Sequence, residues 1–310
     1  MHYGHAVVGV RLVIVTGKGG VGKTTVTAAL GRAAARRGLR TLLVEMASPG
    51  RLAHVLAASK LGPEPQRVSQ RLDAVALDAD HALSVFVHSI MPLRALSGAL
   101  LASDTFRIVA AAVPGIAEAA MLAQVLDWLE PRGFRRAGWD RIILDAPASG
   151  HSAPLFATPG TLGGIASVGP LAQSLQRISK WLHDPGRTTA IVVALPEAWA
   201  VAEAIELHQR LRDEAGVPLA RPVVNAVFPR RFTKADEERL HEAGSDRVGA
   251  PGPLAAARYF LRRREDEQSQ VLALRRGTGE PPLELPFLFD PEMRLEHLDP
   301  IADALDEVLP

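Results

Sequence analysis

The sequence contains no cysteine, and this absence excludes several kinds of site before any motif is considered. Disulfides, thiolate metal sites and cysteine nucleophiles all require the sulfur of that side chain. Long apolar runs are also missing, since none reaches the roughly 20 residues that a membrane-spanning helix needs. Residues 1–11 lack the charged start and the long apolar core of a signal peptide. We therefore expect a cytoplasmic protein without a transmembrane segment.

Lysine is scarce as well, because most of the basic residues are arginine. It stands only at positions 18, 23, 60, 180 and 234. Lys18 and Lys23 lie in one glycine-rich stretch, which suggests that they are retained for a role; the plainer explanation is a base-composition bias in the gene. The formal net charge is +1, so no bulk field favours nucleic acid or an anionic membrane. We do not expect nucleic acid as a partner.

The glycine-rich stretch separates an apolar run from an alanine-rich helical pattern. Residues 11–25 read RLVIVTGKGGVGKTT and fit the phosphate-binding pattern G-x-x-x-x-G-K-[ST] through Gly17, Gly22, Lys23 and Thr24. Glycines let backbone N–H groups approach phosphate oxygens, and the N-terminus of the following helix favours an anion. Lys23 would contact the β- and γ-phosphates, and Thr24 would offer its hydroxyl to Mg²⁺.

The same glycines also fit a second pattern. Gly17, Gly19 and Gly22 spell G-x-G-x-x-G, the dinucleotide fingerprint, and Glu45 lies at about the right distance to bind a ribose hydroxyl. A dinucleotide fold does not require Lys-Thr-Thr at the start of the helix, however. Such a fold also does not require Asp145, the acid at the end of a later apolar strand. The phosphate-loop interpretation is therefore favoured.

That later strand covers residues 139–145, which read WDRIILD and end in Asp145. Phosphate-loop enzymes use an apolar strand that ends in Asp to hold Mg²⁺, usually through water. A strand-terminal Asp is weak evidence alone, but together with the loop at Gly17 it becomes strong. We predict a site for phosphates and Mg²⁺ with Thr24 and Asp145 as the metal-binding residues.

Apolar strands alternate with helical patterns along most of the chain, which predicts an α/β fold of the P-loop NTPase class with a mostly parallel sheet flanked by helices. Strands are expected at 12–15, 40–45, 72–77, 139–145, 189–195, 222–228 and 283–288. Helices are expected at 26–37, 51–60, 171–182, 198–215, 233–243, 254–275 and 292–308, and a loop at 61–70.

We predict a single domain over residues 1–310, with an inserted helical subdomain at about 78–130 that residues 160–184 could extend. The insert is almost entirely helix-forming and rich in apolar residues. These residues form either the core of the subdomain or a hydrophobic face for a client. The core interpretation is favoured, because apolar stripes on helices are usually buried.

Several separated motifs resemble one family. Residues 18–25, KGGVGKTT, resemble the deviant phosphate loop, with its early signature lysine, of the MinD/ParA/nitrogenase-iron-protein class. Residues 139–151, WDRIILDAPASGH, resemble the second switch of the ArsA/GET-pathway ATPases. Residues 113–118 and 223–229 are similar to that family's Pro-Gly-x-x-Glu segment and Val-Val-Asn strand. The resemblance covers most of residues 11–310.

The resemblance implies a homodimeric or heterodimeric ATPase that uses ATP and Mg²⁺ and acts on a protein client or a membrane partner. Lys18 would reach across the dimer to the phosphates of the partner, and residues 145–152 would move with the γ-phosphate. Lys18, Lys23, Glu45 and Asp145 would support catalysis. The implied nucleotide-binding residues are Gly17, Lys18, Gly19, Gly20, Val21, Gly22, Lys23, Thr24, Thr25, Asn225 and Pro286.

One position departs from the family pattern. The first switch of the family has an Asp-Pro-Ala-His run after the second strand, and its Asp helps to position the attacking water. Residues 45–50 read EMASPG here, which aligns Ala47 with that Asp and Glu45 with an earlier acid of ParA-like relatives. We therefore expect slow hydrolysis or a water-positioning role for Glu45. The absence of cysteine also argues against the family's arsenic site and its zinc-linked dimer.

Three functions therefore stay open. The first is a hydrolysing dimeric switch, and the second is a regulatory nucleotide-binding subunit that hardly hydrolyses and pairs with a paralogue. The third is a ParA- or MinD-like positioning ATPase, for which Arg230, Arg231 and residues 262–264 would form a DNA-binding patch. Acidic residues interleave these arginines, and we expect the charge run at 262–267 to be a solvated helical face.

Overall fold

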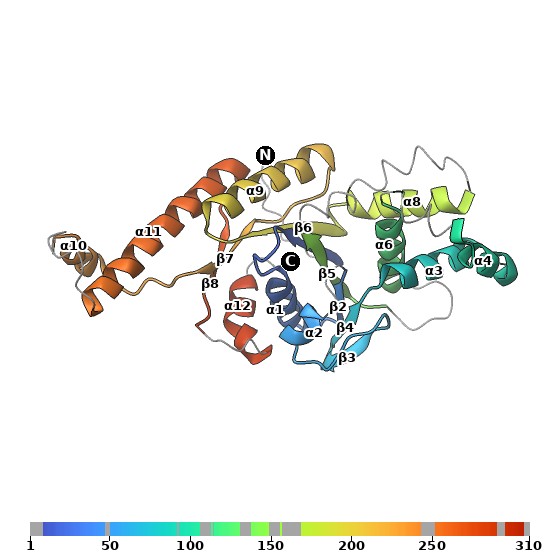
Figure 1. The fold of residues 1–310 in the computed structure, drawn as a ribbon, viewed down its shortest axis with the longest axis horizontal. Coiled ribbons are helices and arrows are strands. Elements are labelled where there is room, and N and C mark those ends of the chain that lie inside the picture. The colour runs from blue at the N-terminus through green and yellow to red at the C-terminus, as the bar shows by residue number, and fades with distance from the viewer. Residues whose placement is uncertain are drawn as a thin grey trace.

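The computed structural model describes residues 9–46, 50–91, 93–105, 113, 115–130, 138–148, 156, 169–242, 252–289 and 295–306. An eight-stranded sheet runs through the centre of the fold in the order β3-β4-β2-β5-β1-β6-β7-β8 (Figure 1). Its strands are β1 (Leu12–Gly17), β2 (Thr41–Glu45), β3 (Gln66–Ser69), β4 (Leu72–Ala76), β5 (Arg141–Ala148), β6 (Thr188–Ala194), β7 (Val223–Val227) and β8 (Leu283–Pro286). Every neighbouring pair is parallel except β3 and β4. The predicted P-loop type of α/β fold is confirmed.

Each predicted strand is present, but the expectation of a loop at 61–70 was wrong. Residues 66–69 form β3, which pairs antiparallel with β4 at one edge of the sheet. Two of its four side chains are exposed and the other two are half-buried, so the segment has no apolar pattern that could reveal it. Edge strands commonly carry polar residues, because they face solvent.

The central strands bury both of their faces, which explains their continuous apolar sequences. Leu12 and Ile14 of β1 enter one hydrophobic cluster, and Val13 and Val15 enter a second cluster on the opposite face. Successive side chains of a strand point to opposite faces, so a strand covered on both sides needs apolar residues at every position.

Helices cover both faces of the sheet. Figure 1 shows α9 and α11 on one side and α1, α2 and α12 on the other, in agreement with the two clusters. The helices are α1 (Lys23–Arg36), α2 (Arg51–Val55), α3 (Ala79–Ile90), α4 (Arg94–Leu101), α6 (Ile116–Leu129), α8 (Gly169–Leu182), α9 (Ala198–Gln209), α10 (Lys234–Glu242), α11 (Pro253–Thr278) and α12 (Asp299–Leu305).

Three predicted helices differ from the observed ones. The helix expected at 51–60 ends at Val55. The helix expected at 198–215 changes to π-helical geometry over Arg210–Glu214. The last helix is divided into a 3₁₀ turn, Leu295–Leu298, followed by α12. Within the described ranges, no helix combines the length and the hydropathy needed to cross a bilayer.

The predicted helical insert contains α3, α4 and α6, which gather with α8 at one end of the fold, on the right in Figure 1. Phe86 of α3 and Leu126 of α6 are buried in the same cluster as Leu12 of β1. In contrast, Leu93 and Leu96 at the start of α4 are 64% and 55% exposed. The apolar residues of the insert are thus partly core and partly surface, and its division from the sheet as a subdomain stays a prediction.

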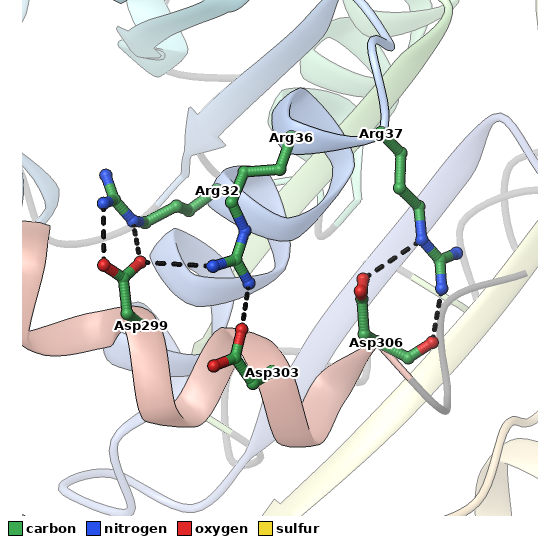
Figure 2. Close-up of polar contacts among 6 residues, drawn as sticks. All are labelled: Arg32, Arg36, Arg37, Asp299, Asp303 and Asp306. Atoms are coloured by element: carbon green, nitrogen blue, oxygen red, sulfur yellow. Dashed lines mark hydrogen bonds and ion pairs between the residues drawn. The ribbon is translucent and has the colours of Figure 1, made fainter.

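A ladder of ion pairs joins the end of α1 to α12 (Figure 2). The pairs are Arg32–Asp299, Arg36–Asp303 and Arg37–Asp306. Arg36 also contacts Asp299 at 3.4 Å, so that carboxylate holds two arginines. Each exposed pair is worth only about 0.2–1 kcal/mol. The ladder fixes the far end of the helix whose first residues, Lys23 and Thr24, belong to the candidate site.

Candidate functional site

The predicted phosphate loop connects β1 to α1 near the middle of the sheet. The strand β1 lies between β5 and β6, and β5 lies between β1 and β2. The register places Glu45, at the end of β2, beside Asp145 of β5. The carboxyl ends of parallel strands meet at one edge of a sheet, which is where ligands bind in folds of this type. The predicted loop and both predicted acids are therefore at the same edge.

Two glycines of the loop are required by close contacts. Gly17 has a φ of +148°, and a Cβ atom at this position would lie 2.3 Å from the carbonyl oxygen of Val193. Gly22 has a φ of +90°, and a Cβ atom there would lie 2.2 Å from Nδ2 of Asn225. Any other residue would strain the backbone and displace a neighbour at both positions.

The other predicted loop residues are less constrained by packing. A Cβ atom on Gly19 would make an ordinary contact at 3.8 Å, and one on Gly20 would meet nothing within 4 Å. Val21 is buried against the apolar cluster beneath α1, whereas Thr25 is half-buried. The open space above Gly20 is consistent with a loop that receives a ligand, because a bound phosphate must approach the backbone there.

Lys23 is held inside the loop that precedes it. Its Nζ donates hydrogen bonds to the carbonyl oxygens of Gly17 at 3.1 Å and Lys18 at 2.9 Å. Burial lowers the pKa of this ammonium group, and the nearby carboxylate of Asp145 opposes the shift. The first turn of α1 has no acidic residue and no side-chain cap. The buried cation and the free N-terminus of a helix together form an environment that favours an anion.

Asp145 lies against the first turn of α1. Its Oδ2 accepts a hydrogen bond of 2.6 Å from the hydroxyl of Thr24. Its Oδ1 is buried and has no hydrogen-bond partner among the described residues. Burial raises the pKa of the carboxyl to about 6, and the opposing effects of Thr24 and Lys23 only partly offset this. A buried carboxylate oxygen without a partner is the kind of atom that a cation satisfies.

The residues present fit a magnesium ion that is bound together with phosphates. Within the described part of the chain, no group of three or more histidine or acidic side chains could hold a metal. Thr24 and Asp145 supply a hydroxyl and a carboxylate, which are suitable oxygen ligands. Mg²⁺ usually takes one or two protein oxygens and completes its octahedron with water and substrate phosphates.

Glu45 has a structural partner that sequence reasoning did not reveal. The side chain is only 2% exposed. Its carboxylate accepts hydrogen bonds from the backbone N–H groups of Gly50 at 3.1 Å and of Arg51 and Leu52 at 3.0 Å. Glu45 therefore caps the N-terminus of α2. Ala47 and residues 149–151 of the second switch lie outside the described residues, so the water-positioning role of Glu45 stays a prediction.

Lys18 is bound to α9 of its own chain. Its Nζ lies 3.0 Å from Oε1 of Glu203 and 5.0 Å from the centre of the Trp199 ring. The indole is 70% exposed, so the lysine covers little of it. Sequence reasoning missed both partners, although Trp199 and Glu203 are four residues apart on a predicted helix and must share one face. The predicted contact of Lys18 with a partner subunit is untested.

Asn225 lies in the middle of β7, and Pro286 is the last residue of β8. The Asn225 Nδ2 donates a hydrogen bond of 2.9 Å to the carbonyl oxygen of Val21, which ties β7 to the phosphate loop. Pro286 pairs with Val227, two residues after Asn225. Asn225 is thus next to the loop and Pro286 lies on the neighbouring strand, and the contact of either residue with an adenine stays a prediction.

Comparisons with known proteins show the family of this chain. Residues 10–167 match the family model of the ArsA ATPases, described as anion-transporting ATPase. ATPase BagA of Mycobacterium tuberculosis is 25% identical over 244 residues, which cover 77% of this chain and 71% of that protein. ATPase GET3C of Arabidopsis thaliana is 24% identical over 261 residues, which cover 69% and 66%.

A third relative is much longer than this chain. The arsenical pump-driving ATPase of Acidiphilium multivorum is 26% identical over 239 residues, which cover 71% of this chain but only 40% of that protein. The chain therefore spans less than half of the length of this relative. The family model matches about half of the chain, including the phosphate loop and Asp145. The chain belongs to the ArsA/GET family of ATPases.

Proposed function

We propose that this chain binds Mg-ATP at the β1–α1 loop, hydrolyses it, and acts as a dimeric nucleotide-driven switch. The observation that carries the proposal is the environment of Asp145: its Oδ2 accepts a hydrogen bond from Thr24, its charge interacts with that of Lys23, and its buried Oδ1 has no partner among the described residues. This combination suits a triphosphate with its metal ion. A dinucleotide site has no need of a buried lysine and a hydroxyl–carboxylate pair at the start of the helix.

The residues of the loop would act mainly by positioning charge. Backbone N–H groups of the loop and the N-terminus of α1 would bind phosphate oxygens, and Lys23 would exchange its two carbonyl contacts for the β- and γ-phosphates. Thr24 and Asp145 would hold Mg²⁺, which supplies neutralising charge for phosphoryl transfer. Asp145 must be ionised for this role, so a cation would also relieve the cost of its burial.

We place Lys18 at the interface with a second copy or a paralogue. In the single chain its charge is engaged by Glu203 and Trp199. The ion pair is about one-third exposed on both sides, and pairs of this kind contribute little. The triphosphate of a partner would therefore compete readily for the lysine, so that closing of the dimer would depend on nucleotide.

A specific observation favours a second candidate, the weakly hydrolysing regulatory subunit. Glu45 uses both of its carboxylate oxygens to cap α2. Three of the roughly four acceptor sites of the carboxylate are used in this way and the side chain is 2% exposed, so little of it is left to position water. Each of these hydrogen bonds is worth about 1.5–3 kcal/mol when the acceptor is charged. We therefore expect slow turnover in this second candidate.

The partner is proposed to be a protein client or a membrane rather than DNA. Leu93 and Leu96 expose apolar surface at the start of α4. Three of the five arginines that could bind DNA are instead paired with acids: Arg230 with Glu237 at 3.1 Å, Arg263 with Glu267 at 2.9 Å and Arg264 with Glu284 at 3.4 Å. Paired guanidinium groups contribute little to phosphate binding, which weakens the ParA-like alternative.

Steady-state ATP turnover tests the proposal. The wild-type chain, Lys23→Ala and Asp145→Asn should be compared with Lys180→Ala, which removes an exposed lysine on α8. We expect turnover only in the wild type and in the Lys180 control. Equal turnover in the wild type and Lys23→Ala would remove the enzyme proposal. Nucleotide binding without turnover in the wild type would instead support the regulatory subunit.

The dimer is tested separately by light scattering with and without Mg-ATP. We expect the molar mass to double with nucleotide in the wild type and to remain that of a monomer in Lys18→Ala. A monomer under all conditions would exclude the homodimer. A paralogous partner would then be sought by mixing the chain with the related chains of the same genome.

A further inference from the structure

Glu267 is a fully buried acid in the middle of α11. The expectation that residues 262–267 form a solvated face holds for Arg262, Glu265 and Asp266, which are exposed, but it was wrong for Glu267. Burying a carboxylate is costly unless it is paired and hydrogen-bonded. The contacts of Glu267 therefore indicate what it holds in place.

The first contact of Glu267 is the backbone of the residue that follows β7. Its Oε2 accepts a hydrogen bond of 2.9 Å from the N–H group of Phe228. The second contact is Arg263, one helical turn earlier, whose Nε donates to Oε1 at 2.9 Å. The guanidinium group also lies 5.7 Å from the ring centre of Phe228. Glu267 and Arg263 thus hold Phe228 through both its backbone and its ring.

The segment held in this way is irregular. Between Val224 and Val227, β7 advances three residues while β8 advances two, so β7 contains a bulge of one extra residue. Ala226 occupies the bulge with a φ of +60°, a left-handed conformation that costs a non-glycine residue about 1 kcal/mol. Such a conformation persists only when the surrounding structure holds it. The hydrogen bond from Phe228 to Glu267 provides a fixed point two residues later.

The bulge sets the orientation of the Asn225 side chain. Its amide lies directly over Gly22 and donates to the carbonyl oxygen of Val21. Apart from this bond, the amide has no hydrogen-bond partner among the described residues. A free amide oxygen and N–H group can together match the N6 amine and N7 acceptor of adenine. Guanine presents a carbonyl at the equivalent edge, which the amide oxygen cannot accept from.

We propose that Glu267 is a positioning residue for base recognition: together with Arg263 it holds the bulge at Ala226, and the bulge aims Asn225 at the purine of the bound nucleotide. Glu267 itself does not touch the nucleotide. The inference rests on the proposed function, because it requires a nucleotide at the β1–α1 loop. It adds that selectivity for adenine depends on an acid buried in α11.

Calorimetric titration separates base recognition from phosphate binding. The ligands are the Mg²⁺ complexes of a non-hydrolysable β,γ-imido analogue of ATP, of the corresponding GTP analogue, and of inorganic tripolyphosphate. The variants are Glu267→Gln, which keeps the volume but places an amide against a donor, and Glu267→Asp, which keeps the charge but shortens its reach. Glu265→Gln is the control, because it removes an exposed acid from the same helix.

We expect both Glu267 variants to bind the ATP analogue about tenfold more weakly, since one charged hydrogen bond is disturbed. Affinities for the GTP analogue and for tripolyphosphate should stay within about twofold of the wild type. Asn225→Ala should show the same loss, and the combination of Asn225→Ala with Glu267→Gln should lose no more than either change alone. The Glu265 control should match the wild type with all three ligands.

Two results would overturn the inference while leaving the proposed function intact. One is an unchanged affinity for the ATP analogue in both Glu267 variants when Asn225→Ala weakens it. The other is a parallel loss of tripolyphosphate affinity, which would mean that Glu267 supports the loop or the fold as a whole. If the wild type binds neither the analogues nor tripolyphosphate, the proposed function itself fails.

Discussion

Asp145 imposes a pH-dependent cost on the nucleotide-free protein. Burial raises the pKa of its carboxyl from 3.8 to about 6 in the folded chain. An acid with a raised pKa in the folded state binds its proton more tightly there than in the unfolded state. The stabilising effect of that proton is therefore complete below about pH 4 and is lost as the pH rises through about 6.

The size of the loss follows from the shift. At about 1.4 kcal/mol per pKa unit, ionised Asp145 costs the folded state about 3 kcal/mol above pH 7. Between pH 5 and pH 7.5, the expected decrease in the free energy of unfolding that is due to this group is about 1.4 kcal/mol. The residue is only 6% exposed, so solvent screens the effect little.

Asp145→Asn removes the ionisation and keeps an oxygen that accepts the hydrogen bond from Thr24. The new amide N–H group replaces an oxygen that has no partner among the described residues, which costs about 1–2 kcal/mol. We therefore expect the variant to be about 1–2 kcal/mol more stable than the wild type at pH 7.5 and about as stable at pH 5. The same variant should lose Mg²⁺-dependent nucleotide binding.

Urea unfolding at both pH values, in a chelator and without nucleotide, measures this difference. Asp266→Asn is the matched control, because it removes an exposed acid from α11. A stability difference between Asp145→Asn and the wild type that does not grow with pH would refute the reasoning about burial. Retention of wild-type ATP turnover by the variant would refute the assignment of Asp145 to the metal.

Three other substitutions test separate parts of the site. Glu45→Gln should destabilise the protein by about 1 kcal/mol in urea unfolding, because the cap of α2 loses its charge, and it should change ATP turnover if Glu45 positions water. Unaltered turnover at the rate of fully active family members would exclude both slow hydrolysis and the role of Glu45. Glu203→Ala removes the partner of Lys18 on α9, so it should lower the Mg-ATP concentration at which light scattering detects the dimer. A higher concentration would contradict the proposed release of Lys18. Ala226→Gly should raise the stability by about 0.5–1 kcal/mol in thermal unfolding, since glycine adopts the left-handed conformation without strain, and a decrease would contradict the description of the bulge.

The strands and the phosphate loop could be predicted because their signals are local. Strands such as β1 and β5 are covered on both faces, so burial demands an apolar residue at nearly every position. The loop from Gly17 to Thr24 is recognisable because phosphate binding requires particular residue types at a fixed spacing. The exposed edge strand β3 escaped prediction because no burial constrains its side chains.

The partners of the charged residues could not be predicted, because they come from distant parts of the chain. Lys18 and Glu203 are 185 positions apart, and Arg32 and Asp299 are 267 apart. Glu267 has the appearance of a solvated acid in its charge run, yet packing of α11 against the end of β7 buries it completely. Whether a charged side chain is free or engaged depends on which backbone or side-chain groups surround it.

The sequence by itself therefore determined the class of fold, and it predicted the phosphate loop and the acid that accompanies it, because each signal follows from burial or from spacing along a short stretch. Only the tertiary structure decided how the charges are used. It assigned Glu45 to the cap of α2, bound Lys18 to α9, left one oxygen of Asp145 without a partner among the described residues, and placed Glu267 beneath the bulge that aims Asn225. The physical reason is that electrostatic and hydrogen-bond energies depend on distance in space and on desolvation, and the folded chain alone sets both.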